Sequence, residues 1–154
     1  MESNQKVIDT LNTLLREELT AINQYMVHAE MAEDWGYAGF HEAEEHAAIE
    51  EMKHAEELIA RILFLGGKPL VNELDKITIG KDIPTMLAND HSLESGAIVS
   101  YNAAIKLMIE EKDNGTRQLL EDILLQEEGH LDWFEEQIDQ LDQMGLPYYL
   151  TTIK

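Results

Sequence analysis

Apolar side chains recur every three or four positions through four long stretches of the chain, which is the period of a helix buried on one face. These stretches cover about Gln5 to Trp35, Phe40 to Leu65, Ile83 to Lys112, and Thr116 to Met144. The turn-forming residues that separate them are Gly36 and Gly39, then Gly66-Gly67-Lys68-Pro69, and finally Asp113-Asn114-Gly115. The pattern predicts an all-α fold with four main helices.

The connection between the second and third predicted helices is long, with about 16 residues that end at Asp82, a candidate N-cap. Fully extended it reaches ~50 Å, enough to return along the second helix, which is ~40 Å long. The second and third helices can then run parallel, in a four-helix bundle with one long crossover. Pro147 suits the first turn of a short fifth helix over Tyr148–Ile153. We expect a single domain over residues 1–154.

The composition removes several classes of function. The chain has 154 residues and no cysteine, which excludes disulfides, zinc–thiolate sites, iron–sulfur clusters and thiol nucleophiles. Its 31 acidic against 11 basic residues give a net charge of −20, so we expect it to attract cations and to bind no nucleic acid. No stretch is apolar enough to cross a membrane, and the first residues lack the pattern of a signal peptide. We therefore expect a cytoplasmic protein.

Six potential metal ligands repeat with one spacing in the two halves of the chain. Each half has a lone glutamate followed 33 positions later by a Glu-x-x-His pair, and the six residues are Glu18, Glu51, His54, Glu94, Glu127 and His130. One such pair is weak evidence, because about one is expected by chance in so acidic a chain. All four glutamates, however, lie on the apolar stripes of their helices, where a bare carboxylate is strongly destabilising.

Metal binding explains these buried carboxylates, because two divalent cations balance four negative charges and two neutral imidazoles complete the ligand sets. We predict that Glu51 and Glu127 bridge both ions. Glu18 and His54 then complete the ligand set of one ion, and Glu94 and His130 complete the ligand set of the other. This ligand pattern is the signature of ferritin-like di-iron and di-manganese bundles. Oxygen-rich sites with one imidazole each favour iron or manganese over copper, while zinc remains a competitor.

The chain resembles the bacterioferritins over essentially its full length. The stretches that carry the resemblance are Ala21-Ile22-Asn23-Gln24-Tyr25, Asp34-Trp35-Gly36, Glu51-Met52-Lys53-His54-Ala55, Arg61-Ile62-Leu63-Phe64-Leu65, Glu127-Glu128-Gly129-His130 through Trp133, and Met144-Gly145-Leu146 with Tyr149-Leu150.

The resemblance implies a hollow cage of 24 subunits built of dimers, with two iron ions in each subunit. It implies ferroxidase activity, in which oxygen or hydrogen peroxide oxidises Fe(II) and the ferric product is stored as mineral inside the cage. It also implies a b-type haem between two subunits, with one methionine from each as axial ligand, and Met52 stands at that position. A small ferredoxin is the implied electron donor for iron release.

Met52 points about 100° away from Glu51 around the helix, on a second apolar row, so packing against another subunit is the alternative role for it. Tyr25 lies two turns after Glu18. The resemblance places a tyrosine here beside the di-iron site and implicates it, like Trp133, in electron supply, whereas a core tyrosine is the alternative.

Several histidines remain outside the six-residue pattern. The resemblance suggests an inner-surface iron site at His46 with Glu50, where some members have an aspartate in place of the glutamate. We expect the other three, which are His28, His41 and His91, to be ordinary surface or packing histidines. Gln126, an aspartate in some relatives, receives no role.

Other functions fit the same bundle. A rubrerythrin-like peroxidase or a manganese catalase would keep the site and change its chemistry, although a rubrerythrin normally adds a cysteine-ligated iron domain. A DNA-binding mini-ferritin holds its iron between subunits and would not need both Glu-x-x-His pairs in one chain. An acidic scaffold or cytokine-like binder gives no reason for carboxylates on the core stripes.

Overall fold

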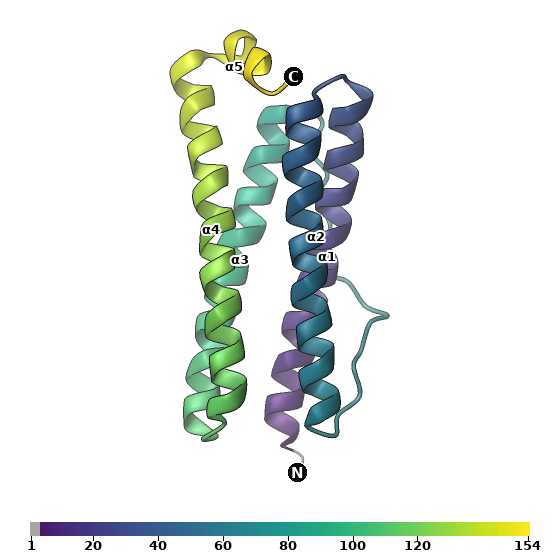
Figure 1. Cartoon of the computed structure of the whole chain (residues 1–154), viewed down its shortest axis with the longest axis vertical. Helices are drawn as coiled ribbons and strands as arrows, with labels where there is room; N and C mark the ends of the chain where they lie inside the picture. Colours follow the sequence, from purple (N-terminus) through teal and green to yellow (C-terminus); the bar gives the residue numbers. More distant parts are fainter. Residues whose placement is uncertain (1–3) are drawn as a thin grey trace.

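The computed structural model describes residues 4–154, which form five helices. Their bounds are α1 Gln5–Asp34, α2 Ala38–Phe64, α3 Ile83–Glu110, α4 Asn114–Met144 and α5 Leu146–Thr152. The first four pack side by side as a long bundle, and α5 lies across one end (Figure 1). The predicted all-α fold with a short C-terminal helix is confirmed. The expected lack of a signal peptide and the start of the domain at residue 1 involve residues 1–3, which lie outside the described residues.

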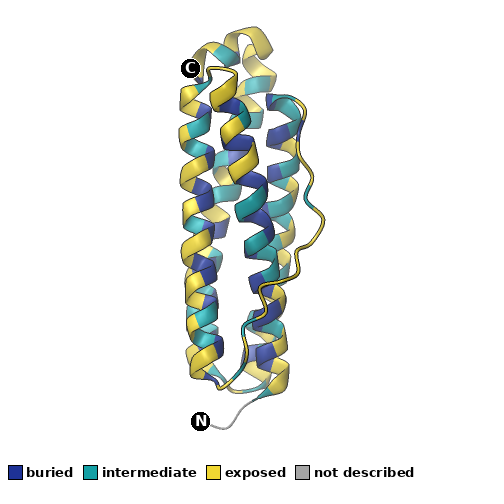
Figure 2. Ribbon diagram, turned by 90° about the vertical axis from the view of Figure 1, so that its right-hand side faces the viewer, coloured by how far each residue is buried: buried dark blue, intermediate teal, exposed yellow. Residues whose placement is uncertain are grey.

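The long crossover makes α2 and α3 parallel, as the sequence predicts. It leaves the end of α2 and runs up the outside of the bundle to the start of α3 (Figures 1 and 2). Buried polar side chains of α1 accept hydrogen bonds from the backbone of this crossover. Leu70 N–H donates to Asn12 Oδ1, Asp75 N–H to Thr20 Oγ1, Thr78 N–H to Gln24 Oε1, and Gly80 N–H to His28 Nε2.

The second helix begins earlier than the sequence suggests. The pattern predicts Gly39 in the break before the helix, whereas it is the second residue of α2. Its N–H donates to the carbonyl of Ile153, and an added Cβ would lie 3.0 Å from that oxygen. Gly39 therefore allows the C-terminal segment to approach α2 closely, a tertiary reason that a helix pattern does not reveal.

The turn between α3 and α4 also differs from the expected Asp113-Asn114-Gly115 turn. Helix α3 ends at Glu110, and Lys112 takes a left-handed conformation with φ 58°. Asp113 is the N-cap of α4, where its side chain accepts from Thr116 N–H, so Asn114 and Gly115 are already helical. Helix α4 thus begins two residues before the predicted Thr116.

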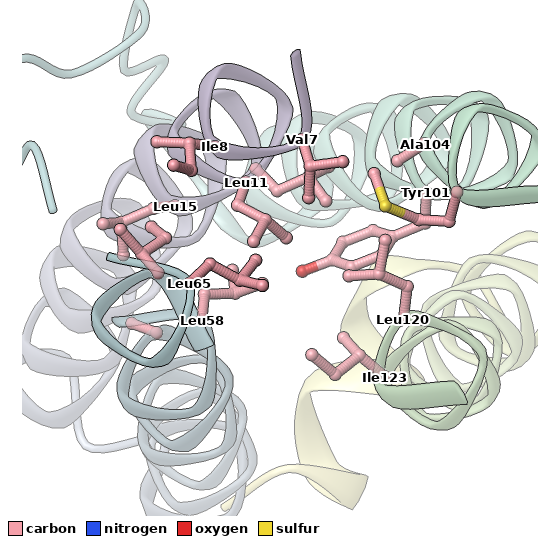
Figure 3. Packing of buried hydrophobic residues seen from close by; sticks show 14 residues of the cluster. Val7, Ile8, Leu11, Leu15, Leu58, Leu65, Tyr101, Ala104, Leu120 and Ile123 are labelled. Carbon is pink, nitrogen blue, oxygen red and sulfur yellow. The ribbon is translucent and has the colours of Figure 1, made fainter. Parts of the chain in front are cut away.

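Two apolar clusters fill the bundle and leave a polar layer between them. The first lies toward the chain's start and includes Val7, Leu58, Tyr101 and Leu120, one from each main helix (Figure 3). The second lies toward α5 and includes Tyr25, Phe40, Leu87 and Phe134. In every main helix the predicted metal ligands fall between the residues of these two clusters. Among the described residues, no helix is long and apolar enough to span a membrane.

Candidate metal centre

The six predicted ligands meet in the polar layer at the middle of the bundle. They form two overlapping groups of four, in each of which one potential ligand atom per residue lies within 4.8 Å of the others. The groups are Glu18, Glu51, His54 and Glu127, and Glu51, Glu94, Glu127 and His130. The two glutamates common to both groups are the two that the sequence pattern places between the ions. The structure therefore brings together every residue of the predicted set.

Each imidazole turns its Nδ1 toward the carboxylates. His54 Nδ1 lies 3.0 Å from Glu127 Oε1 and 3.7 Å from Glu18 Oε1. His130 Nδ1 lies 2.8 Å from Glu51 Oε1 and 3.4 Å from Glu94 Oε1. The two rings stack with centroids 6.2 Å apart. A pocket of this shape offers mixed oxygen and nitrogen ligands to two small cations.

Several buried ligand atoms make no hydrogen bond of acceptable geometry, even where a carboxylate oxygen lies close to a ring nitrogen. They are Glu18 Oε2, Glu51 Oε1, Glu94 Oε2, Glu127 Oε2 and His130 Nδ1. Buried polar atoms without partners are rare in proteins because each is destabilising. Two bound cations, one in each group of four, would give all of these atoms a partner, so the donor set fits the two metal ions that the sequence predicts.

The pKa values of the clustered side chains also fit a metal site. Burial, helped by the negative charge of the neighbouring Glu127, raises the pKa of Glu94 to about 8 and outweighs the hydrogen bond with His130, which lowers it. Burial also raises the pKa of Glu18, as does the adjacent Glu51. For His54, burial alone would lower the pKa, but hydrogen bonds with its three carboxylate neighbours raise it well above the usual range. The metal-free cluster therefore holds protons that a divalent cation has to displace.

Two tyrosines bind the lone glutamates from the opposite helix. Tyr25 Oη donates to Glu94 Oε1 at 2.5 Å, and Tyr101 Oη donates to Glu18 Oε1 at 2.5 Å. Both hydroxyls are buried. Tyr101 is not among the site residues that the sequence pattern predicts. The sequence does contain a signal for the contact, because Tyr101 follows Glu94 by seven positions just as Tyr25 follows Glu18.

The Nε2 atoms of the two imidazoles, which face away from the carboxylates of the cluster, also have hydrogen-bond partners. His54 Nε2 lies 2.8 Å from Gln126 Oε1, and His130 Nε2 lies 2.5 Å from Glu50 Oε2. Glu50 reaches His46 as well, whose Nε2 lies 3.2 Å from Glu50 Oε1. Glu50 and His46 thus form a continuous chain of polar contacts from the exposed surface of α2 to His130.

Two cavities approach the cluster. One, of about 240 Å³, opens between α1, α3 and the crossover and is lined by Glu17, Glu18, Glu51, Asp75 and Glu94 among others. The second, of about 480 Å³, lies between α2 and α4 and is lined by His46, Glu50, His130 and Trp133 among others. Acidic side chains line both, so cations can reach the buried ligands from two sides of the bundle.

A third cluster of potential ligands has a structural role. His28, Glu44 and Asp90 are fully buried near α5. His28 Nε2 accepts from Gly80 N–H, which leaves the proton on Nδ1, and Nδ1–H donates to Asp90 at 2.9 Å. An imidazole with both nitrogens engaged in this way has no lone pair left for a metal. His28 is therefore neither a surface residue nor a free ligand, and it fastens the crossover to α1.

Met52 lies outside the metal cluster, on the exposed side of α2. Its side chain is 44% exposed, and nearby positions of α1 and α2 also expose large apolar groups, among them Met26 and Ile49. His41 and His91 are partly exposed and contact carboxylates at the surface.

Comparisons with known proteins agree with this architecture. A family model described as a ferritin-like domain matches residues 8–144. The chain is 41% identical to a bacterioferritin of Rhodobacter capsulatus over 145 residues, which are 94% of this chain and 90% of that protein. It is 37% identical to a bacterioferritin of Brucella melitensis, covering 97% of this chain and 92% of the relative. It is 40% identical to a bacterial ferritin of Pseudomonas aeruginosa, covering 97% of both chains.

Proposed function

Because the chain belongs to the ferritin-like family, within its bacterioferritin group, we propose that it stores iron and oxidises Fe(II) at the six-residue cluster. The observation that carries this proposal is the pair of overlapping ligand groups, which share Glu51 and Glu127 and hold four carboxylates and two imidazoles. Two Fe(II) ions neutralise these four carboxylates and take the place of the protons that the metal-free cluster holds. Iron is the substrate here, and oxygen or hydrogen peroxide is the oxidant.

The protein contributes binding, orientation and proton transfer. Glu51 and Glu127 hold the two ions side by side, so that two electrons leave together and no one-electron oxygen product need be released. Tyr25 and Tyr101 each fix a lone glutamate by donating a hydrogen bond, which orients its carboxylate toward the ions. We also assign Tyr25 and Trp133 to electron supply, as the resemblance implies. The protons released from the cluster on metal binding leave through the two acidic cavities.

The test is aerobic addition of Fe(II) to the metal-free protein, with Glu18→Ala beside the wild type. We expect a fast rise in near-ultraviolet absorbance that saturates at two irons per chain in the wild type. The fast phase should fall at least about ten-fold in Glu18→Ala, because one ion loses a ligand. Glu57→Gln, an exposed change on α2, is the control and should behave as the wild type.

The peroxidase and manganese catalase alternatives predict a different result from the same experiment. No fast phase with Fe(II) and oxygen, or a fast phase that Glu18→Ala leaves intact, would contradict ferroxidase activity at this site. Rapid turnover of hydrogen peroxide by the manganese-loaded protein would then favour the catalase. The absence of cysteine from the sequence leaves no ligands for the additional iron domain of a rubrerythrin.

We also propose that this chain assembles with copies of itself into a cage of 24 subunits and binds a b-type haem between two of them. The thioether of Met52 is exposed among apolar side chains, as an axial ligand shared across a subunit contact requires. The haem would supply electron transfer toward stored iron, with a small ferredoxin as the donor. His46 with Glu50 would serve as an iron site on the inner surface, because they lie at the mouth of the larger cavity. The acidic charge supports no nucleic-acid partner.

A further inference from the structure

The six ligands and the two tyrosines repeat in the two halves of the metal centre, but the partners of the histidine Nε2 atoms differ. Glu50 and Gln126 each precede a bridging glutamate by one residue, and each reaches the histidine of the opposite helix. Glu50 meets His130 Nε2, whereas Gln126 meets His54 Nε2. The tyrosine contacts, by contrast, are the same on both sides, at 2.5 Å each. A carboxylate in one half thus corresponds to a neutral amide in the other.

The identity of the group behind a metal-bound histidine changes how strongly the histidine binds. A carboxylate that accepts the outer N–H of an imidazole makes the ring a better electron donor and adds a negative charge near the metal. An amide oxygen orients the ring but adds no charge. Removing such a partner typically changes metal affinity by about 10- to 100-fold.

We infer that the two metal positions are unequal, and that the position completed by Glu94 and His130 binds a divalent cation more tightly than the position completed by Glu18 and His54. Glu50 raises the cation affinity of the tight position, and Gln126, which has no charge, leaves the other position with a lower affinity. The inference rests on the six ligands of the proposed function, and it adds the order in which the positions fill.

The other charged groups next to the two positions, among the described residues, make no hydrogen bond to a ligand histidine. On the tight side, His46 contacts Glu50 from the surface of α2, where the imidazole is 72% exposed and the carboxylate remains hydrogen-bonded to His130. On the weak side, Glu17 is the next carboxylate along α1. Its Oε1 accepts from Ser100 Oγ at 2.6 Å, and it makes no hydrogen bond to a ligand imidazole. Glu50 is the carboxylate that touches a ligand histidine from outside the cluster.

The experiment is anaerobic titration of the metal-free protein with Co(II), followed by calorimetry, which measures binding without oxidation. For the wild type we expect the two positions of the cluster to take one Co(II) each, in two steps that differ at least about ten-fold in affinity, apart from the surface site proposed at His46 and Glu50. Glu50→Gln should weaken the first step about ten-fold, and Gln126→Glu should strengthen the second step about ten-fold. Either change makes the two affinities more nearly equal. Glu50→Gln does so by lowering the higher affinity, and Gln126→Glu by raising the lower one.

Variants that remove one position identify which step belongs to it. Glu94→Ala should leave only the weak step, and Glu18→Ala should leave only the tight one. The matched controls are Glu57→Gln and Gln140→Glu, which change charge at exposed positions of α2 and α4, and both should leave the two affinities unchanged. Thermal unfolding of each metal-free variant shows that its fold is kept.

Two equal affinities in the wild type would overturn the inference. So would Glu50→Gln and Gln126→Glu variants that keep the wild-type difference, or a tight step that survives in Glu94→Ala. The result is separable from the proposed function. Two unequal Co(II) steps without a fast aerobic Fe(II) phase would keep the inequality and reject ferroxidase activity, and the reverse outcome would reject the inequality alone.

Discussion

Asp82 shows how one side chain starts a helix and links its stability to pH. Its carboxylate accepts from the backbone N–H and the hydroxyl of Thr85, and Thr85 Oγ1 accepts in return from Asp82 N–H. This capping box satisfies donors that the first turn of α3 would otherwise leave free. The hydrogen bonds from Thr85 lower the pKa of Asp82 below its usual value of 3.8.

We predict that Asp82→Ala lowers the free energy of unfolding at pH 7 by about 1 kcal/mol. The folded-state pKa lies below the unfolded one, so this stabilisation is complete above the unfolded value of 3.8 and is lost as pH falls through the folded value. The deficit of the variant should therefore shrink as pH falls below about 4. Denaturant unfolding of the metal-free protein measures it. A deficit that stays constant with pH would show that the carboxylate charge does not contribute.

Tyr101 shows which part of a contact is local and which is not. It pairs with Glu18 because two helices place their residues at matching heights, and its seven-residue offset from Glu94 repeats that of Tyr25 from Glu18. The offset is visible in the sequence, and the partner across the bundle is not. Local spacing gives the face of a helix, while the neighbour on that face depends on packing.

At the scale of elements, the end of α3 is held by backbone bonds around a left-handed residue. Asp113 N–H donates to Met108 carbonyl at 2.9 Å, and Lys112 N–H donates to Ile109 carbonyl at 3.1 Å. This pair of bonds is the Schellman motif, which usually places glycine where this chain has Lys112, at φ 58°. A side chain with a Cβ is destabilised in this conformation.

We predict that Lys112→Gly raises the free energy of unfolding by about 1 kcal/mol, because glycine adopts positive φ without steric cost. Lys112→Ala is the matched control. It removes the same charge and keeps the Cβ, so it should give no such gain. Urea unfolding of both metal-free variants beside the wild type decides between backbone strain and charge. Equal stabilisation by alanine would assign the effect to charge.

At the scale of the whole molecule, two apolar clusters enclose the charged layer and a third apolar surface faces outward. The enclosed layer holds the predicted ligands in a buried setting where a missing cation is costly. The outward surface exposes Met26, Ile49 and Met52 on α1 and α2. Exposed apolar side chains of this size on neighbouring helices are typical of a subunit contact.

We predict that Met52→His keeps the fast Fe(II) oxidation and changes the visible absorption spectrum of bound haem. The reason is that histidine replaces a thioether as axial ligand, outside the cluster of carboxylates. Spectra of the purified oligomer measure the change. Met144→His, an exposed change at the far end of α4, should leave the haem spectrum as it is. An unaltered spectrum in Met52→His would remove Met52 as the ligand.

The sequence by itself determined the helices, the long crossover and the six candidate ligands. Period and spacing are local properties, and burying a carboxylate is unfavourable wherever the rest of the chain lies. Spacing alone therefore predicts Glu51 and Glu127 as the shared pair, and both belong to each of the two groups of four in the folded chain. Where the pattern is wrong about a boundary, as at Gly39, the reason is a contact with a distant segment.

Only the tertiary structure decided which side chains meet across helices. The contacts of His130 with Glu50 and of His54 with Gln126 join residues 80 and 72 positions apart, and no periodicity encodes them. The same holds for His28, which fastens the crossover because Gly80 packs against it. Helix rotation and height set these contacts, and both depend on how four apolar faces fill one core.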